Sequence, residues 1–206
     1  RGRDERIGGF NSGLAACHTA ERRVRELITR YGIETLLAGV QSNLERSEAR
    51  MRAQIAKLPD GEYFYEDYLE TFSQPPEYRL EPLLLPLHLT VTGETLTADF
   101  TGAAEQAPAP VNSTLAVTAA SVFITLKSVF DPTQALNHGS FRPVSVIAPL
   151  GTIVNVTHPA PAGSHGEIRK RVIATMLGAL AHACPELSSA DIHRTSFHNL
   201  IGGVDP

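Results

Sequence analysis

The chain has 206 residues, of which 42% are hydrophobic and 19% are charged, so it is not intrinsically disordered. The net charge is −4 with both signs interspersed, which excludes the basic patch of a nucleic-acid-binding protein and a polybasic membrane anchor. The N-terminus lacks an apolar signal segment. We therefore expect a cytoplasmic protein that binds neither nucleic acid nor membrane. Cys17 and Cys184 are expected to be reduced, with a bridge between them as the alternative.

Two helices are predicted in the first part of the chain. Residues 1–18 are rich in glycine, and we expect them to be irregular. From Thr19 the apolar residues follow a helical period, and Gly32 is placed to end this helix. A second amphipathic helix follows, with Glu48 and Arg52 paired on its exposed face. Two helices joined by one glycine form either a helical hairpin or a kinked long helix.

The middle of the chain predicts strands and then a buried helix. Residues 62–86 mix tyrosines with prolines, which indicates a short strand or irregular segment and then a loop. Alternation of apolar and polar residues on each side of Gly93 predicts a β-hairpin over residues 87–100 with one buried face. A buried helix is predicted over residues 115–130, and the NST sequence at 112–114 can cap it.

The last part of the chain predicts two more strands and a helix. The strands are expected at residues 144–148 and 152–156, and the amphipathic helix at residues 166–183. The complete order predicts an α+β fold, in which a helical hairpin is followed by antiparallel β-hairpins and two packed helices. We expect a helical N-terminal segment at residues 1–60 and an α+β portion at residues 61–206.

Motifs for common cofactors are missing from the sequence. It contains neither the phosphate loop of many ATP-binding proteins nor the HExxH zinc motif. His193 and His198 lie near Asp191, a spacing that a metal site or ordinary partly buried histidines can explain. The second explanation is the simpler one, and we expect no metal in this chain.

Two loops concentrate polar residues that can bind a ligand. Residues 157–171 carry His165 and Arg169 at a helix start, where backbone N–H groups and cationic side chains favour anions. The structural alternative is a capped helix with a charged first turn. The turn-rich loop NHGSFRP contains Asn137 and Arg142, which can reach a ligand or, alternatively, leave Arg142 paired with a nearby carboxylate.

Four ordered blocks of the sequence together resemble those of a known family. They are PDGEY in residues 59–63, DFTG followed by Gln106 and Asn112, NHGSFRP followed by IAPLG in residues 137–151, and the helix that ends before Pro185. In this order they resemble the hydantoinase B/oxoprolinase family. The family includes N-methylhydantoinase and 5-oxoprolinase components and subunits of acetone and acetophenone carboxylases. The resemblance implies an internal fragment of a longer B-type subunit.

The resemblance also implies a division of labour between two subunits. A hydantoinase A-type partner would use ATP and Mg to activate a carbonyl of a small-molecule substrate, and the B-type chain would assist ring opening in a hetero-oligomer. A divalent metal is expected only in the N-terminal part of the family that this sequence lacks. We therefore expect an ATP-dependent hydrolase of cyclic amides, such as hydantoins, oxoproline or lactams, whose isolated fragment is inactive. Ketone carboxylation and a mainly structural assembly role are the alternatives.

Five residues are candidates for a polar substrate-binding site in which they would bind substrate and stabilise charge. They are Asn112, Asn137, Arg142, His165 and Arg169. No nucleophile or general base is assigned. The sequence SHGE at residues 164–167 departs from the Gly/Asn-rich pattern of the hydantoinase branch, so the substrate class stays open.

Overall fold

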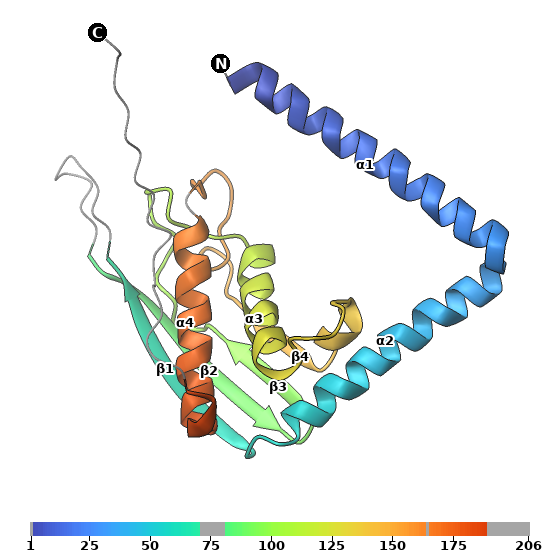
Figure 1. The fold of residues 1–206 in the computed structure, drawn as a ribbon. Helices are drawn as coiled ribbons and strands as arrows, with labels where there is room; N and C mark the ends of the chain where they lie inside the picture. The colour runs from blue at the N-terminus through green and yellow to red at the C-terminus, as the bar shows by residue number, and fades with distance from the viewer. Residues whose placement is uncertain (1, 71–80, 164, 189–206) are drawn as a thin grey trace, which may run out of the picture. The chain divides into compact units, whose positions relative to one another are not determined.

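The structure is a computed structural model that describes residues 2–70, 81–163 and 165–188. By its internal contacts the chain divides into two units, Arg1–Arg46 and Ser47–Pro206. The elements are α1 Gly2–Tyr31, α2 Ile33–Ile55, β1 Gly61–Leu69, β2 Leu83–Thr92, β3 Thr95–Asp99, α3 Leu115–Phe130, the 3₁₀ helix η2 His138–Phe141, β4 Val144–Ile147, α4 His165–Ala183 and the 3₁₀ helix η3 Pro185–Leu187 (Figure 1). Across the described residues, no helix combines the length and apolar content needed to cross a bilayer.

The first unit is helical from its start. α1 begins at Gly2, so the prediction that residues 1–18 are irregular is wrong. The apolar residues Ile7, Phe10 and Leu14 keep the three-and-four spacing of a helix through this stretch, and that period outweighs the glycines between them.

Gly32 separates α1 from α2. Its φ of +78° lies in the left-handed region that glycine adopts readily, and its N–H donates to the carbonyl of Ile28 at 2.8 Å. The prediction that Gly32 ends the first helix is therefore confirmed. Apolar side chains of both helices, such as Leu27 and Leu37, are exposed. The two helices are thus consecutive helices joined at a glycine and do not form a hairpin with a buried core of its own.

The second unit contains a mixed sheet in the order β1-β2-β3-β4. The β-hairpin predicted over residues 87–100 is confirmed as β2 and β3, joined at Gly93 with a φ of +56°. β1 pairs with β2 along its whole length, so the tyrosine-rich segment forms a strand. β4 runs parallel to β3, which corrects the expectation of antiparallel pairing throughout. The chain passes through α3 between these two strands, and such a crossover returns the second strand in the same direction.

The sheet also contains a proline within a strand. β2 begins at Leu83 and includes Pro86, which we expected in a loop. Pairing between β2 and β3 starts only at His88, opposite Asp99, so Pro86 lies beyond the end of β3. A strand tolerates the missing N–H of proline best where its ladder is incomplete.

The prediction of a strand at residues 152–156 is wrong. The chain turns at Gly151, whose φ is +81° and whose N–H donates to the carbonyl of Asn155 at 2.9 Å. Thr152 makes only isolated bridges, to Glu105 and to Asn155. The Thr152 hydroxyl also donates to the carbonyl of Pro149 and stabilises the turn. The segment is therefore not extended and cannot pair as a strand.

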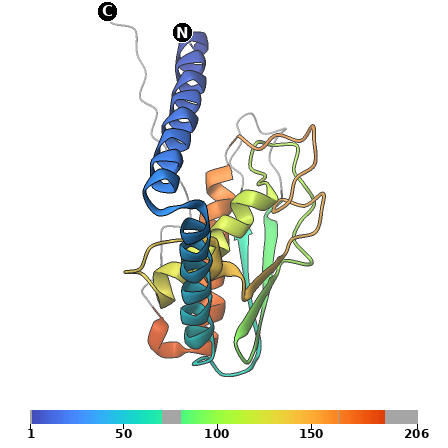
Figure 2. The same ribbon diagram turned by 90° about the vertical axis from the view of Figure 1, so that its right-hand side faces the viewer.

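One face of the sheet carries the core. Leu85, Leu87, Leu89 and Val91 of β2 point to this face and are buried, while the alternate residues of the strand, except Pro86, are more exposed. α3 and α4 lie side by side against the same face (Figures 1 and 2). These helices confirm the predictions for residues 115–130 and 166–183, and with the sheet they confirm the α+β class.

The last turns of α2 belong to this core as well. Met51 and Ile55 are almost completely buried in the same hydrophobic cluster as the sheet. This explains why the division between the two units falls at Ser47, inside α2, whereas the sequence suggested a division at residue 60.

Candidate functional site

A polar cluster forms where the C-terminal half of α2 passes the end of α3 and η2. We call it the α2–η2 cluster. Its members are Ser47, Glu48, Arg50, Arg52, Lys127, Asp131, Asn137 and Arg142. They come from three separate stretches of sequence, and all lie within the second unit.

Glu48 joins two of the arginines in the cluster. Its Oε1 accepts from Nη2 of Arg52 at 2.7 Å, and its Oε2 accepts from Nη1 of Arg142 at 3.1 Å. These hydrogen bonds, first from Arg52 and then from Arg142, lower the pKa of Glu48 below its ordinary value. The predicted pair of Glu48 and Arg52 is confirmed, but it is partly buried and not on a fully exposed face. Arg142 is paired with a carboxylate, as its structural alternative expects.

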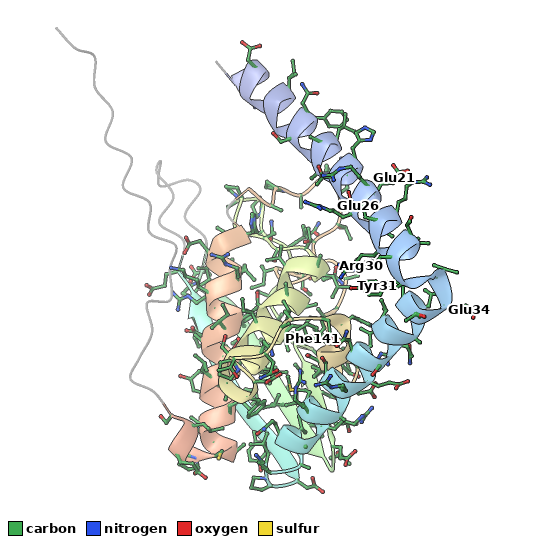
Figure 3. The ribbon with its side chains drawn as sticks, turned by 45° about the vertical axis from the view of Figure 1, so that its right-hand side comes forward. Glu21, Glu26, Arg30, Tyr31, Glu34 and Phe141 are labelled. Atoms are coloured by element: carbon green, nitrogen blue, oxygen red, sulfur yellow. The ribbon has the colours of Figure 1, made fainter. Side chains whose placement is uncertain are left out.

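Asn137 connects η2 to α2. Its Nδ2 donates to Oγ of Ser47 at 2.7 Å, and its Oδ1 accepts from the backbone N–H of Gly139 at 2.9 Å, which caps η2. The ring of Phe141, which is labelled in Figure 3, stacks on the ring of Phe123 of α3 with a centroid distance of 4.3 Å. The loop that carries Asn137 and Arg142 is therefore fixed on both sides.

The third part of the cluster lies at the end of α3. Nζ of Lys127 lies 2.6 Å from Oδ2 of Asp131, and Nε of Arg50 lies 3.6 Å from the same oxygen. Both members of the Lys127–Asp131 pair are about nine-tenths buried. Among the described residues, three buried side-chain atoms have no hydrogen-bond partner, namely Nε of Arg50 in this cluster, the hydroxyl of Ser140 in η2, and Nε of Arg171 in α4. The cluster thus contains more cationic side chains than carboxylates, an arrangement suited to an anionic group.

Sequence reasoning missed most of this cluster. Ser47, Arg50, Lys127 and Asp131 were not among the candidates. The four-residue spacing between Lys127 and Asp131 was a signal for a helical ion pair. Nothing in the sequence indicated that Ser47 would meet Asn137, because that contact depends on how α2 packs against the second unit.

Asn112 lies elsewhere, in the loop before α3, and is completely buried. Its Oδ1 accepts from Ala107 N–H, and its Nδ2 donates to the carbonyls of Ala107, Ala109 and Pro161 at 2.8 to 3.1 Å. The side-chain amide therefore fastens two loops together. The N-cap of α3 is Thr114, the last residue of the NST sequence, but it makes no side-chain hydrogen bond there, and Asn112 does not cap the helix.

Other polar residues of the family-like blocks have similar structural roles. Oδ1 of Asp99 accepts from the backbone N–H of Thr101 at 2.8 Å. Oε1 of Gln106 accepts from the backbone N–H and the hydroxyl of Thr157. Nδ2 of Asn155 donates to the carbonyl of Ala148. These side chains hold the long loops at one end of the sheet in a defined shape.

His165 and Arg169 lie in the first turns of α4, and both are exposed. The loop before α4 is tied to Asn112 through the carbonyl of Pro161. The structure therefore divides the five candidates into two groups. Asn112, His165 and Arg169 surround the start of α4, and the other two candidates belong to the α2–η2 cluster.

Arg171 anchors α4 next to this group. Its Nη1 donates to Oδ1 of Asp67 on β1 at 2.9 Å, and the two side chains are only 17% and 8% exposed. Within the described residues, no three His, Cys, Asp or Glu side chains are grouped as metal ligands would be. The pair His193 and His198 lies outside the described residues.

The family model described as Hydantoinase B/oxoprolinase matches residues 1–206. The chain belongs to this family. Among curated relatives it is similar to the B component of a D-/L-hydantoinase from Pseudomonas sp. (strain NS671), with 31% identity over 90% of this chain and 33% of the relative. The chain thus spans about a third of the length of such relatives.

Two solved structures share the fold. The ATP-dependent caprolactamase from Pseudomonas jessenii matches with a TM-score of 0.78 and 26% identity, over 88% of this chain and 31% of that one. A nucleotide-free acetone carboxylase matches with a TM-score of 0.70 and 17% identity, over 82% of this chain and 24% of that one. At this lower identity the second match shows the fold alone. The hydantoinase B/oxoprolinase fold therefore occurs in enzymes with different chemistry.

Proposed function

We propose that this chain is part of the B-type subunit of an ATP-dependent enzyme that hydrolyses cyclic amides. The observation that carries the proposal is the similarity to an ATP-dependent caprolactamase over 88% of this chain. The hydantoinase relative supports the same reaction class, because a hydantoin is also a cyclic amide. An A-type partner would complete the enzyme as a hetero-oligomer.

ATP and Mg would be used by the partner, where they would convert the unreactive amide carbonyl into a phosphorylated, more electrophilic one. The polar residues of this chain would bind the substrate and stabilise negative charge at the reacting carbonyl. Arg142 and Asn137 would do so as hydrogen-bond donors in the α2–η2 cluster. His165 and Arg169 would bind the substrate from the start of α4.

Asn112 has a different place in this proposal. Its amide is already engaged with backbone groups of two loops, so it would act by holding the loop before α4 in position. An Asn112→Ala variant would then shift the segment that carries His165. We expect a raised KM together with lower stability.

The reaction class is tested with the intact protein and its A-type partner. Hydantoin, 5-oxoproline and caprolactam are supplied separately with ATP and Mg, and the open-chain product is measured by mass spectrometry. We expect product only when both proteins and ATP are present. No ATP-dependent ring opening of any cyclic amide would contradict the proposal. Consumption of acetone or acetophenone that requires bicarbonate would instead identify a carboxylase.

The role of Arg142 needs a separate test, because this residue also pairs with Glu48. Arg142→Ala removes both the pair and a substrate donor, whereas Glu48→Gln weakens the pair and keeps the donor. If Arg142 binds substrate, the first variant lowers kcat/KM much more than the second. Equal losses would assign Arg142 a structural role. Lys57→Ala, at an exposed site away from both groups, is the control with unchanged activity.

A further inference from the structure

α1 carries a mostly apolar seam that is exposed along most of its length, with Ile28 partly buried. Residues at alternating three- and four-residue steps form the seam over residues 7–31, about three and a half heptads. They are Ile7, Phe10, Leu14, Cys17, Glu21, Val24, Ile28 and Tyr31. The side chains of Ile7, Phe10, Leu14, Val24 and Tyr31 are 47% to 69% exposed. Three to four heptads are the length at which such a pattern indicates a coiled coil.

α1 has little to stabilise it as a single helix. Gly8, Gly9 and Gly13 lie in its interior, and a Cβ built at any of them would meet nothing within 4 Å. Each glycine costs roughly 1 kcal/mol of helix stability relative to alanine. Its ion pairs, such as Arg22 with Glu26 and Arg25 with Glu21, are exposed and contribute little. Burial of the seam is therefore the main source of stability available to this helix.

The composition of the seam distinguishes between orientations of a paired helix. In a parallel, in-register pair of two copies, Glu21 would face Glu21 at the centre of the seam, where like charges repel. In an antiparallel pair that overlaps all eight positions, Glu21 faces Cys17 of the second copy. Every other seam residue then faces an apolar one, for example Leu14 against Val24.

The positions beside the seam fit the antiparallel pair as well. Arg25 would face Asn11 of the second copy, and Ala20 would face Ala20, so no two arginines or two carboxylates are brought together. Gly13 and Ala20 leave room for the helices to approach closely. Glu21 keeps Arg25 as its partner at 2.8 Å, and one polar position in an apolar seam fixes register and orientation.

We propose that α1 pairs with α1 of a second copy of this chain as an antiparallel two-stranded coiled coil. The proposal is independent of the enzymatic reaction, because it rests only on the sequence and exposure of α1.

Disulfide trapping tests the arrangement in the intact protein. Glu21→Cys places a thiol opposite the natural Cys17 of the second copy. Mild oxidation should give a covalent dimer, and mass spectrometry of its peptides should identify a bond between Cys17 of one copy and the cysteine introduced at position 21 of the other. Thr19→Cys places a thiol on the opposite face of α1 and should give no such bond. A dimer of the unmodified protein, with Glu21 in place, that is joined through Cys17 of both copies would overturn the antiparallel arrangement.

The strength of self-association gives a second, independent readout. Sedimentation equilibrium should show a dimer for the unmodified protein. Leu14→Glu should weaken dimerisation at least roughly a hundredfold, since it removes a buried leucine and adds a charge to the seam. Thr19→Glu, on the exposed face, should leave the dimer unchanged. A monomer at all concentrations would overturn the proposal. The reaction of Cys17 with maleimide then shows whether the seam of this monomer is exposed to solvent or shielded. In the shielded case another part of the polypeptide covers the seam.

Discussion

The two halves of α2 have the same spacing of apolar residues but different surroundings. Ile33 and Leu37 in the first half are 48% and 59% exposed, whereas Met51 and Ile55 in the second half are buried against the sheet. The apolar spacing of a helix therefore does not by itself show whether these residues are buried by the rest of the chain. The difference locates the end of the packed unit within one continuous helix, and it separates residues that stabilise the fold from residues available to a partner.

The largest effect is expected at the buried ion pair of the packed unit. Arg171→Leu removes the guanidinium group that pairs with the buried carboxylate of Asp67, which should lower the free energy of unfolding by about 4 kcal/mol. Arg23→Leu, in an exposed pair of α1, should change it by less than about 0.5 kcal/mol. Urea unfolding measures both. A double variant, Asp67→Asn with Arg171→Leu, should lose less than the two single losses added together, because it removes both charges of the pair.

A pair of isoleucine variants tests the two halves of α2 directly. Ile55→Ala should cost about 3 kcal/mol of unfolding free energy, since it leaves a cavity in the core. Ile33→Ala removes the same atoms from an exposed position of the same helix and should cost less than about 0.5 kcal/mol. Thermal unfolding of the two variants, at one protein concentration, compares them. Similar losses at both positions would show that the first half of α2 is also packed.

A pair of glycine variants should have opposite signs. A Cβ at Gly178 of α4 would lie 2.6 Å from the ring of Tyr65, so Gly178→Ala should destabilise the fold by about 2 kcal/mol. A Cβ at Gly39 of α2 would meet nothing within 4 Å, and Gly39→Ala should stabilise the helix by up to about 1 kcal/mol. The unfolding midpoint of each variant is compared with that of the unmodified protein. Shifts of the same sign for both variants would contradict this account of their surroundings.

The smallest effect is expected in the pH dependence of Glu48. Because Arg52 and Arg142 lower its pKa in the folded chain, Glu48 stabilises the fold above the ordinary value of 4.5, and this contribution is lost as the pH falls through the lowered pKa. Glu48→Gln should therefore be less stable than the unmodified protein at neutral pH, and the two should converge in acid. A gap that stays constant or widens towards pH 3 would refute the assignment.

Local patterns predicted most of the elements but few of the side-chain roles. The hairpin around Gly93 and the helices α3 and α4 follow from alternation and period, which act over a few residues. The strand predicted near Thr152 failed because side-chain and backbone hydrogen bonds closed a tight turn there. The prediction for residues 1–18 was wrong in the opposite sense, because it missed a helix. It gave more weight to the glycines than to the regular spacing of the apolar residues.

The candidate site was harder to predict because its partners are far apart in the sequence. A polar residue in a family-like block can bind a substrate or hold parts of the fold together. Asn112 has the second role, because its amide donates to the carbonyl of Pro161 in another loop. Arg142 likewise found Glu48 on α2, almost a hundred residues earlier in the chain. These contacts depend on tertiary packing, which residue types and spacing do not encode by themselves.

The most direct test of the proposed function is the coupling of ATP hydrolysis to ring opening. ADP release by the intact protein together with its A-type partner is measured with and without a cyclic amide. Our account predicts that the amide stimulates ADP release and that open-chain product accumulates with it. ADP release that is stimulated only by a ketone with bicarbonate, or by no cyclic amide at all, would contradict it.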